Sequence, residues 1–162
     1  MIDRKGSATV TLPSDLEIYI ERKFDYPAAL VFKAYTTPEL VKRWWGFETS
    51  EWLVCEIDLR VGGMWRYVTR EQEGYEVAFH GEYQEIDAPT RLVSTEVFEM
   101  FPDASALDTI VFEEENGVTT MKMTVLHSAK EHRDAHVESG MEGGMQVSMD
   151  RLEAVAAELA QG

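Results

Sequence analysis

Two histidines near the end of the sequence stand four residues apart, the spacing that places two metal ligands on one face of a helix. They are His132 and His136. Nearby side chains that could serve as a third ligand are Glu131, Asp134 and Glu138. No distant Cys or His is marked out to complete the set, and Lys130 and Arg133 add positive charge. We therefore interpret this segment as an exposed polar turn and predict no metal site.

A second polar group lies on two neighbouring predicted strands and consists of Arg66, Tyr67, His80 and Glu82. General acid–base catalysis needs such groups to converge within hydrogen-bond distance. His80 and Glu82 share a strand face, but so do many solvated pairs in sheets. The sequence has no Gly-Xaa-Ser-Xaa-Gly elbow, P-loop or dinucleotide fingerprint. Cys55 falls on the apolar side of its strand, which indicates a buried small hydrophobe rather than a nucleophile. We predict no catalytic residue and no cofactor.

Methionine at helical spacing is the other notable pattern. Met141, Met145 and Met149 recur every four residues between Gly140 and Leu159, which predicts an amphipathic helix of about 20 residues. The polar face of this helix carries Gln146, Asp150 and Glu153. Three flexible thioethers on the apolar face make an adaptable lining. Two glycines near the helix start also suggest a need for small residues, since each internal Gly costs about 1 kcal/mol relative to Ala.

The predicted cavity lies between the first half of this helix and a sheet, although a filled core is an equal alternative. Strand alternation places Met121 and Met123 on one face with Val125 and His127, so this row can meet the helix methionines across the interior. The side chains expected to line the cavity are Met121, Met123, Met141, Gly144, Met145, Ser148 and Met149, with Trp65, Phe79 and Phe98 as further contributors. The loop from Glu99 to Asp108 and the end of the second short helix would guard the entrance.

The elements that position these residues follow from periodicity and turn residues. Leu16, Ile18 and Ile20 alternate with polar residues and predict the first main strand. Two short helices follow, opened by Asp25-Tyr26-Pro27 and by Thr37-Pro38-Glu39, because Pro is tolerated in the first helical turn. Further strands are predicted over residues 53–61, 64–68, 75–86, 91–98, 109–114 and from 119 on. Asn116-Gly117 predicts a two-residue hairpin, since both positions need positive φ.

This order of elements predicts an α+β fold, in which a curved antiparallel sheet wraps around the long C-terminal helix. We expect residues 1–162 to form a single domain, with residues 1–15 as an N-terminal extension or edge strand. Thirty acidic against fifteen basic residues give a net charge of −15. That field repels nucleic acid and anionic membranes, whose recognition starts from a basic surface. We expect neither as a partner, and a homodimer stays open.

The cellular location is predicted from the apolar segments and the cysteine content of the sequence. No apolar run reaches the length of a transmembrane helix, and no apolar stretch follows Arg4 and Lys5 as a secretory signal would require. Cys55 is the only cysteine, which fits a reducing compartment. We therefore expect a cytoplasmic protein.

A set of residues spread from about Leu16 to Leu159 recurs in a known superfamily. These residues are Phe24-Asp25-Tyr26-Pro27, Val31-Phe32, Thr36-Thr37-Pro38-Glu39-Leu40, Trp44-Trp45-Gly46, Asp58-Leu59-Arg60-Val61-Gly62-Gly63, Trp65-Arg66, Gly81-Glu82-Tyr83, Glu85-Ile86, Pro89-Thr90-Arg91-Leu92, Gly140-Met141-Glu142, Gly144 and Ser148-Met149-Asp150-Arg151-Leu152. With them the chain resembles the SRPBCC or START-like helix-grip superfamily, and within it the heat-shock chaperone ATPase activator homologues. The resemblance implies a cavity between sheet and terminal helix that binds an apolar or amphipathic small molecule.

One residue departs from that pattern. Met145 stands where relatives commonly carry an aromatic residue, usually Trp, so we expect a larger or softer cavity, and we expect Met145→Trp to weaken binding. Our leading hypothesis is non-enzymatic binding of a hydrophobic small molecule. The resemblance leaves three alternatives open: self-resistance to enediyne antibiotics by sequestration or self-sacrifice, a cyclase or aromatase-like enzyme, and a chaperone-interacting module. The enzyme predicts converging polar groups deep in the cavity, and purely apolar walls would exclude it.

Overall fold

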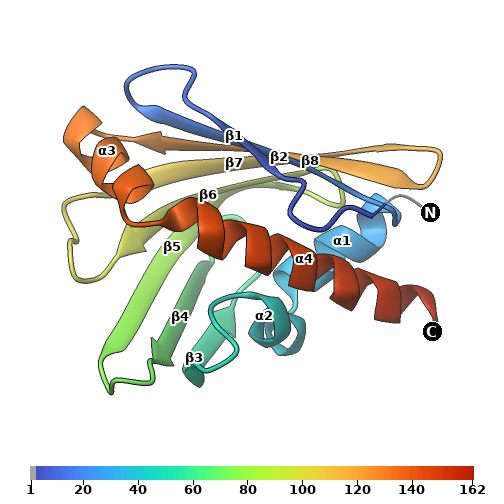
Figure 1. Ribbon diagram of the computed structural model, residues 1–162, viewed down its shortest axis with the longest axis horizontal. Helices are drawn as coiled ribbons and strands as arrows, with labels where there is room; N and C mark the ends of the chain where they lie inside the picture. The colour runs from blue at the N-terminus through green and yellow to red at the C-terminus, as the bar shows by residue number, and fades with distance from the viewer. Residues whose placement is uncertain (1–2) are drawn as a thin grey trace.

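The computed structural model describes residues 3–162, and in that range it contains an antiparallel sheet of eight strands and four helices (Figure 1). The strands are β1 (Thr9–Thr11), β2 (Glu17–Phe24), β3 (Glu51–Ile57), β4 (Met64–Arg70), β5 (Glu76–Asp87), β6 (Arg91–Phe98), β7 (Ala106–Glu115) and β8 (Val118–His127). The helices are α1 (Ala28–Thr36), α2 (Pro38–Trp44), α3 (Lys130–Glu138) and α4 (Met141–Ala160). The predicted α+β helix-grip fold is confirmed. Residues 1 and 2, part of the predicted N-terminal extension, lie outside the described residues.

The sheet has the order β1-β2-β8-β7-β6-β5-β4-β3. It is curved, with β3 and β4 angled away from β1 and β2, and α4 crosses its concave face (Figure 1). The two short helices follow β2, as expected, and both pack against α4. Because strand side chains alternate between faces, one row of each strand points toward the helices. This row supplies both the core and the candidate site.

Several predicted boundaries shift for identifiable reasons. The alternating pattern of residues 53–61 suggested one long strand, but β3 ends at Ile57. Residues 58–63 form a turn closed by backbone hydrogen bonds from Arg60 to Asp58 and from Gly63 to Arg60. Asn116 and Gly117 have φ of 54° and 79°, which confirms the predicted hairpin. The strand predicted from 109 begins instead at Ala106, so Asp108 belongs to β7 and not to a loop.

The polar face of α4 is covered and not free. Arg22 of β2 is 2% exposed; its guanidinium binds Asp150 at 2.8 Å and also pairs with Glu153. Gln146 exchanges two hydrogen bonds with the backbone of Ala8, at 3.1 and 2.7 Å. The segment before β1 therefore runs along the helix and, with β2, holds it against the sheet. A buried charge of this kind must be paired, since an isolated one costs several kcal/mol.

The core has two adjoining parts. The larger lies between the sheet and α1, α2 and α4, and it includes Phe24, Phe112 and Leu152, all fully buried. The smaller lies under the start of α4, around Ile18 and Val125. Between residues 3 and 162, no helix combines the length and the apolar character needed to cross a membrane.

Candidate functional site

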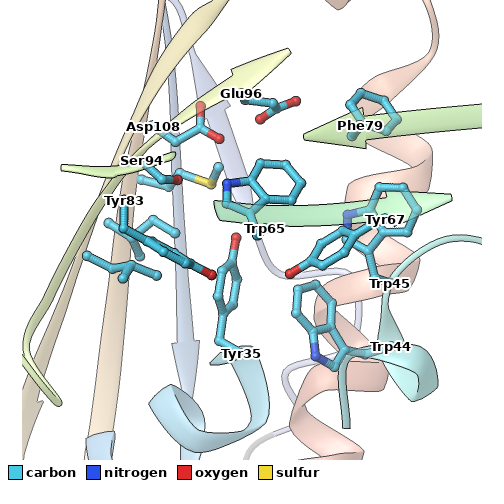
Figure 2. Close-up of a pocket in the computed structure, with 13 residues that line it drawn as sticks. Tyr35, Trp44, Trp45, Trp65, Tyr67, Phe79, Tyr83, Ser94, Glu96 and Asp108 are labelled. Atoms are coloured by element: carbon cyan, nitrogen blue, oxygen red, sulfur yellow. The ribbon is translucent and has the colours of Figure 1, made fainter. Parts of the chain in front are cut away.

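A cavity of about 120 Å³ lies between the sheet and the helices α1 and α2 (Figure 2). Its walls come from strands β4 to β8, from α1, and from the end of α2. The lining side chains are Tyr35, Trp44, Trp45, Trp65, Tyr67, Phe79, Tyr83, Leu92, Ser94, Glu96, Asp108, Ile110 and Met123. Seven of these are aromatic, so most of the wall is ring surface. The volume is well above what a single water molecule needs, and it suits a compact organic molecule.

Three tyrosines bring their hydroxyl groups to the middle of this space. Tyr35 comes from α1, Tyr67 from β4 and Tyr83 from β5, and their hydroxyls point toward one another in Figure 2. None of the three hydroxyls has a hydrogen-bond partner within residues 3–162. Burial raises the pKa of each phenol above its usual range. All three therefore stay protonated and can donate to, or accept from, a bound molecule.

The tryptophans hold these tyrosines in place from the side. Trp45 packs edge-on against Tyr67 and Phe79, with ring centroids 5.3 and 5.5 Å apart. Trp65 lies 4.7 Å from Tyr67, and its indole nitrogen donates to the carbonyl oxygen of Thr95 at 3.3 Å. Such tilted and edge-to-face pairs are favoured by the ring quadrupole. The aromatic walls are thus a connected set with defined orientation.

Carboxyl groups occupy the opposite end of the cavity from Trp44 (Figure 2). Ser94 of β6 faces Asp108 of β7 in the strand register, and Glu96 follows on the same face two residues along. Asp108 is 6% exposed, and its Oδ1 atom has no hydrogen-bond partner in the described chain. Burial raises the pKa of Asp108 well above its usual range. The negative charge of Glu96 and a hydrogen bond with Glu96 raise this pKa further. The Asp108 carboxyl therefore keeps its proton to a higher pH than an exposed aspartate does.

A histidine pair lies beyond this end, where α3 covers β8. His127 Nε2 lies 3.0 Å from His136 Nδ1. Burial lowers the pKa of His127 to about 4 and also lowers that of His136, so both are neutral at pH 7. The predicted exposed turn is wrong, because these residues form helix α3 and Arg133 is buried there against the carbonyl of Ser14. Residues 3–162 contain no group of three or more side chains arranged to hold a metal.

Three of the residues predicted from the sequence line this cavity: Trp65, Phe79 and Met123. Met121 and Met149 are buried in the adjoining core, and Phe98 stacks on Phe79 at 4.9 Å. The α4 residues Met141 and Met145 pack on the smaller core, while Gly144 and Ser148 are half-buried on the same helix. None of the lining residues comes from α4, so the structure places the space beside α1 and α2.

The sequence interpretation missed the polar lining, although a signal was present. Leu92, Ser94 and Glu96 occupy alternate positions of one strand, and Asp108 alternates with Ile110 and Phe112 of the next. A carboxylate in phase with buried apolar residues points inward. Because residues 99–108 were interpreted as a loop, Asp108 was not recognised as an inward-facing residue of a strand.

Three members of the polar group considered for catalysis, Arg66, His80 and Glu82, lie on the other face of the same strands, whereas the fourth, Tyr67, lines the cavity. Arg66 and His80 alternate with the inward Tyr67 and Phe79, and both contact Glu99 at the start of the loop after β6. Glu99 accepts from Arg66 at 2.9 and 3.0 Å and lies 2.9 Å from His80 Nδ1. The hydrogen bonds from Arg66, with that from His80, lower the pKa of Glu99 to about 2. This group fixes the base of the loop that carries the exposed Met100 and Phe101.

Comparisons with known proteins agree with this architecture. The family model described as Activator of Hsp90 ATPase homolog 1-like protein matches residues 25–157. A protein from Rhodobacter sphaeroides has a similar fold, with 23% identity over 93% of this chain and 99% of that one and a TM-score of 0.86. A protein from Nitrosomonas europaea is 24% identical over 93% of this chain and 100% of that one, with a TM-score of 0.82. A third, from Arthrobacter aurescens, is 24% identical over 93% of this chain and 91% of that one, with a TM-score of 0.82. A search of curated proteins found no match.

Proposed function

The chain belongs to the Activator of Hsp90 ATPase homolog 1-like family, and from this premise we propose that it binds a small amphipathic molecule in the cavity of Figure 2. The observation that carries the proposal is the cavity itself, about 120 Å³ of space walled by seven aromatic side chains. Small-molecule sites are typically apolar concavities with a few placed polar groups. Here the polar groups are the three phenols and the Glu96–Asp108 pair.

The cavity sets the scale of affinity. A molecule of one ring that buries about 150 Å² of apolar surface gains roughly 4 kcal/mol from burial, from which the entropy cost of association must be subtracted. Hydrogen bonds to Tyr35 and Tyr83 would add to this because those hydroxyls have no partner to give up. We expect micromolar to millimolar binding of single-ring compounds such as phenol or indole.

The test is titration calorimetry of phenol and indole against the protein and three tryptophan variants. Met123→Trp fills the cavity wall and is expected to weaken binding at least about tenfold. Met145→Trp tests whether the start of α4 shares the ligand space, as the sequence predicts. Val147→Trp is the matched control, since Val147 is 49% exposed on the same helix. The proposal fails if no probe gives saturable heat, or if Met123→Trp binds as the unaltered protein does.

The polar end of the cavity favours a second candidate, an enzyme that uses acid–base catalysis. Converging polar groups are what a cyclase-like reaction requires, and Asp108, Glu96 and Tyr35 provide them. Asp108, whose raised pKa keeps it protonated to a higher pH, would donate the proton, and Glu96 supplies a second carboxyl beside it. For such an enzyme Asp108→Asn should abolish turnover and change substrate affinity by no more than about threefold. Turnover that survives Asp108→Asn rejects this candidate.

The two remaining alternatives stay predictions. Antibiotic sequestration would use the same cavity, and self-sacrifice predicts a chain cut at a backbone glycine after exposure to an enediyne; an intact chain counts against it. A chaperone-interacting module predicts an exposed docking surface and a partner recovered by pull-down.

A further inference from the structure

The cavity is acidic as well as aromatic. Its polar end carries the carboxyls of Glu96 and Asp108, and no Lys, Arg or His is among the side chains that line it. Other partly buried acids do have cationic partners: Asp150 and Glu153 bind Arg22, and Glu99 binds Arg66. Within residues 3–162, no ion pair involves Glu96 or Asp108.

Asp108 is also left with an open acceptor. Its side chain is almost fully buried, yet Oδ1 has no partner among the described residues. Buried polar atoms are nearly always hydrogen-bonded, because an unmade bond costs the full desolvation of the group. Asp108 lines the cavity, so a ligand that reaches its carboxyl can supply the missing donor.

The walls add a second feature that selects charge. The faces of Tyr, Trp and Phe rings carry partial negative charge, and they attract cations within about 6 Å of the ring centre. Trp65, Tyr67 and Tyr83 surround the middle of the cavity, and Trp45 and Phe79 close one side (Figure 2). Rings on several sides with carboxyls at one end form a cation-selective pocket.

We propose that the ligand is an organic ammonium cation, either a protonated amine or a quaternary ammonium, enclosed by the aromatic rings with Glu96 and Asp108 as counter-charge. This inference rests on the proposed function and names the chemical class of its ligand. The overall charge of −15 supports it, since a strongly negative protein attracts cations and repels anions. Anionic and neutral molecules of the same shape leave the carboxyl pair without a counter-charge.

Binding has a proton balance that can be measured. The raised pKa keeps Asp108 protonated to a higher pH than usual when the cavity has no cation. A bound ammonium favours the ionised carboxylate, so binding releases this proton to solvent. The other titratable groups that face the pair or lie beyond it are Tyr35 of α1, Tyr67 of β4, Tyr83 of β5, His127 of β8 and His136 of α3. The phenols stay protonated and the histidines neutral between about pH 7 and pH 9. Asp108 is therefore the source of the proton, and affinity rises with pH.

The experiment compares choline with 3,3-dimethyl-1-butanol, which has the same shape and no charge. We expect calorimetry to show choline binding at least about tenfold more tightly than the alcohol. We also expect choline affinity to rise as the pH passes through the range in which the Asp108 carboxyl loses its proton. Titration in two buffers of different ionisation enthalpy should show release of up to one proton per choline bound.

Two isosteric variants locate the effect. Glu96→Gln and Asp108→Asn should each weaken choline at least about tenfold and change the affinity for the alcohol by no more than about twofold. Glu73→Gln, on the exposed turn between β4 and β5, removes the same charge and should leave choline affinity within about twofold. Thermal unfolding of each variant establishes that it is folded.

The outcomes separate this inference from the proposed function. If the alcohol, phenol or indole binds in the cavity but choline binds no better than the alcohol, the ammonium inference is wrong and small-molecule binding stands. If choline binds and Glu73→Gln weakens choline binding as much as Glu96→Gln does, the overall negative charge of the protein accounts for the binding. The ammonium inference is then wrong as well. If none of these molecules binds, the proposed function fails as well.

Discussion

Asp108 couples the protonation of the cavity to the stability of the fold. Its pKa is raised in the folded state, so between about pH 3.9, the usual value for an unfolded Asp, and the raised value, the folded protein holds one more proton than the unfolded chain. Stability contributed at this site therefore falls as pH rises through that window. The group is most favourable to folding when it is protonated.

We predict that Asp108→Asn is more stabilising at high pH than at low pH. The amide stays neutral and can still donate to Glu96, so the variant avoids the cost of burying a second charge. Urea unfolding of both proteins at about pH 4.5 and about pH 8 measures the difference. Because His127 titrates in both proteins, its effect cancels in the comparison. Parallel stability curves for the two proteins would contradict the prediction.

Gly81 is required by the close approach of Trp65. A Cβ atom at this position would overlap both the carbonyl oxygen of Thr95 and the indole nitrogen of Trp65. We predict that Gly81→Ala destabilises the protein by about 1–3 kcal/mol and shifts Trp65 out of the cavity wall. Urea unfolding gives the energy, and tryptophan fluorescence reports the displaced ring. The control is Gly74→Ala, at an exposed turn where the φ of 98° strains an alanine but its Cβ atom meets no other atom. An unchanged tryptophan fluorescence signal in Gly81→Ala would contradict the predicted displacement of Trp65.

Among the elements, α4 carries a pair of glycines that its packing does not require. A Cβ atom on Gly143 or Gly144 would meet no atom within 4 Å. The expected need for small residues at the helix start is thus not visible in its contacts. Both lie in the first turns of a 20-residue helix, where glycine lowers helix stability.

We predict that Gly143→Ala and Gly144→Ala each stabilise the protein by about 0.5–1 kcal/mol, because alanine loses less backbone entropy on folding. The midpoint of urea unfolding is the measurement. Ala154 of the same helix is exposed, so Ala154→Gly provides the reverse control and should cost a similar amount. A destabilised Gly144→Ala would mean that the helix start needs a glycine for some contact that packing alone does not reveal.

The elements themselves could be predicted from the sequence, whereas only Trp65, Phe79 and Met123 of the side chains that line the cavity were predicted. Proline at position 38 and the Asn116-Gly117 pair mark local geometry, so the α2 start and the last hairpin follow from nearby residues. The position of α4 over the sheet depends instead on long-range pairs such as Arg22 with Asp150, which periodicity does not encode. Methionine spacing predicted an inward face correctly but could not say whether the inward side chains meet core atoms or open space.

At the scale of the whole molecule, the excess of acidic residues acts against the compact state. A net charge of −15 repels itself, and most of the ion pairs at the surface are exposed and contribute little. Salt screens this repulsion, since the Debye length falls from about 20 Å at 0.02 M to about 6 Å at 0.3 M.

We predict that the melting temperature rises by a few degrees between about 0.02 M and about 0.3 M NaCl at pH 7. Scanning calorimetry gives the value. The same pair of scans near the isoelectric point serves as the control, because the net charge there is small and the increase should largely disappear. A melting temperature that falls with salt at pH 7 would show that ion pairs outweigh the repulsion.

The ties between the first and last segments have a consequence for how the protein forms during synthesis. Ala8 and Gln146 are 138 residues apart in the chain, and the paired residues of β2 and β8 are 95 to 109 residues apart. As the polypeptide leaves the ribosome, strands β3 to β7 can pair with their neighbours in turn, while β2 keeps an unpaired edge until β8 emerges. The segments from α1 to β7 therefore leave the ribosome before the helix that crosses them, and the sheet is completed only after β8 has emerged.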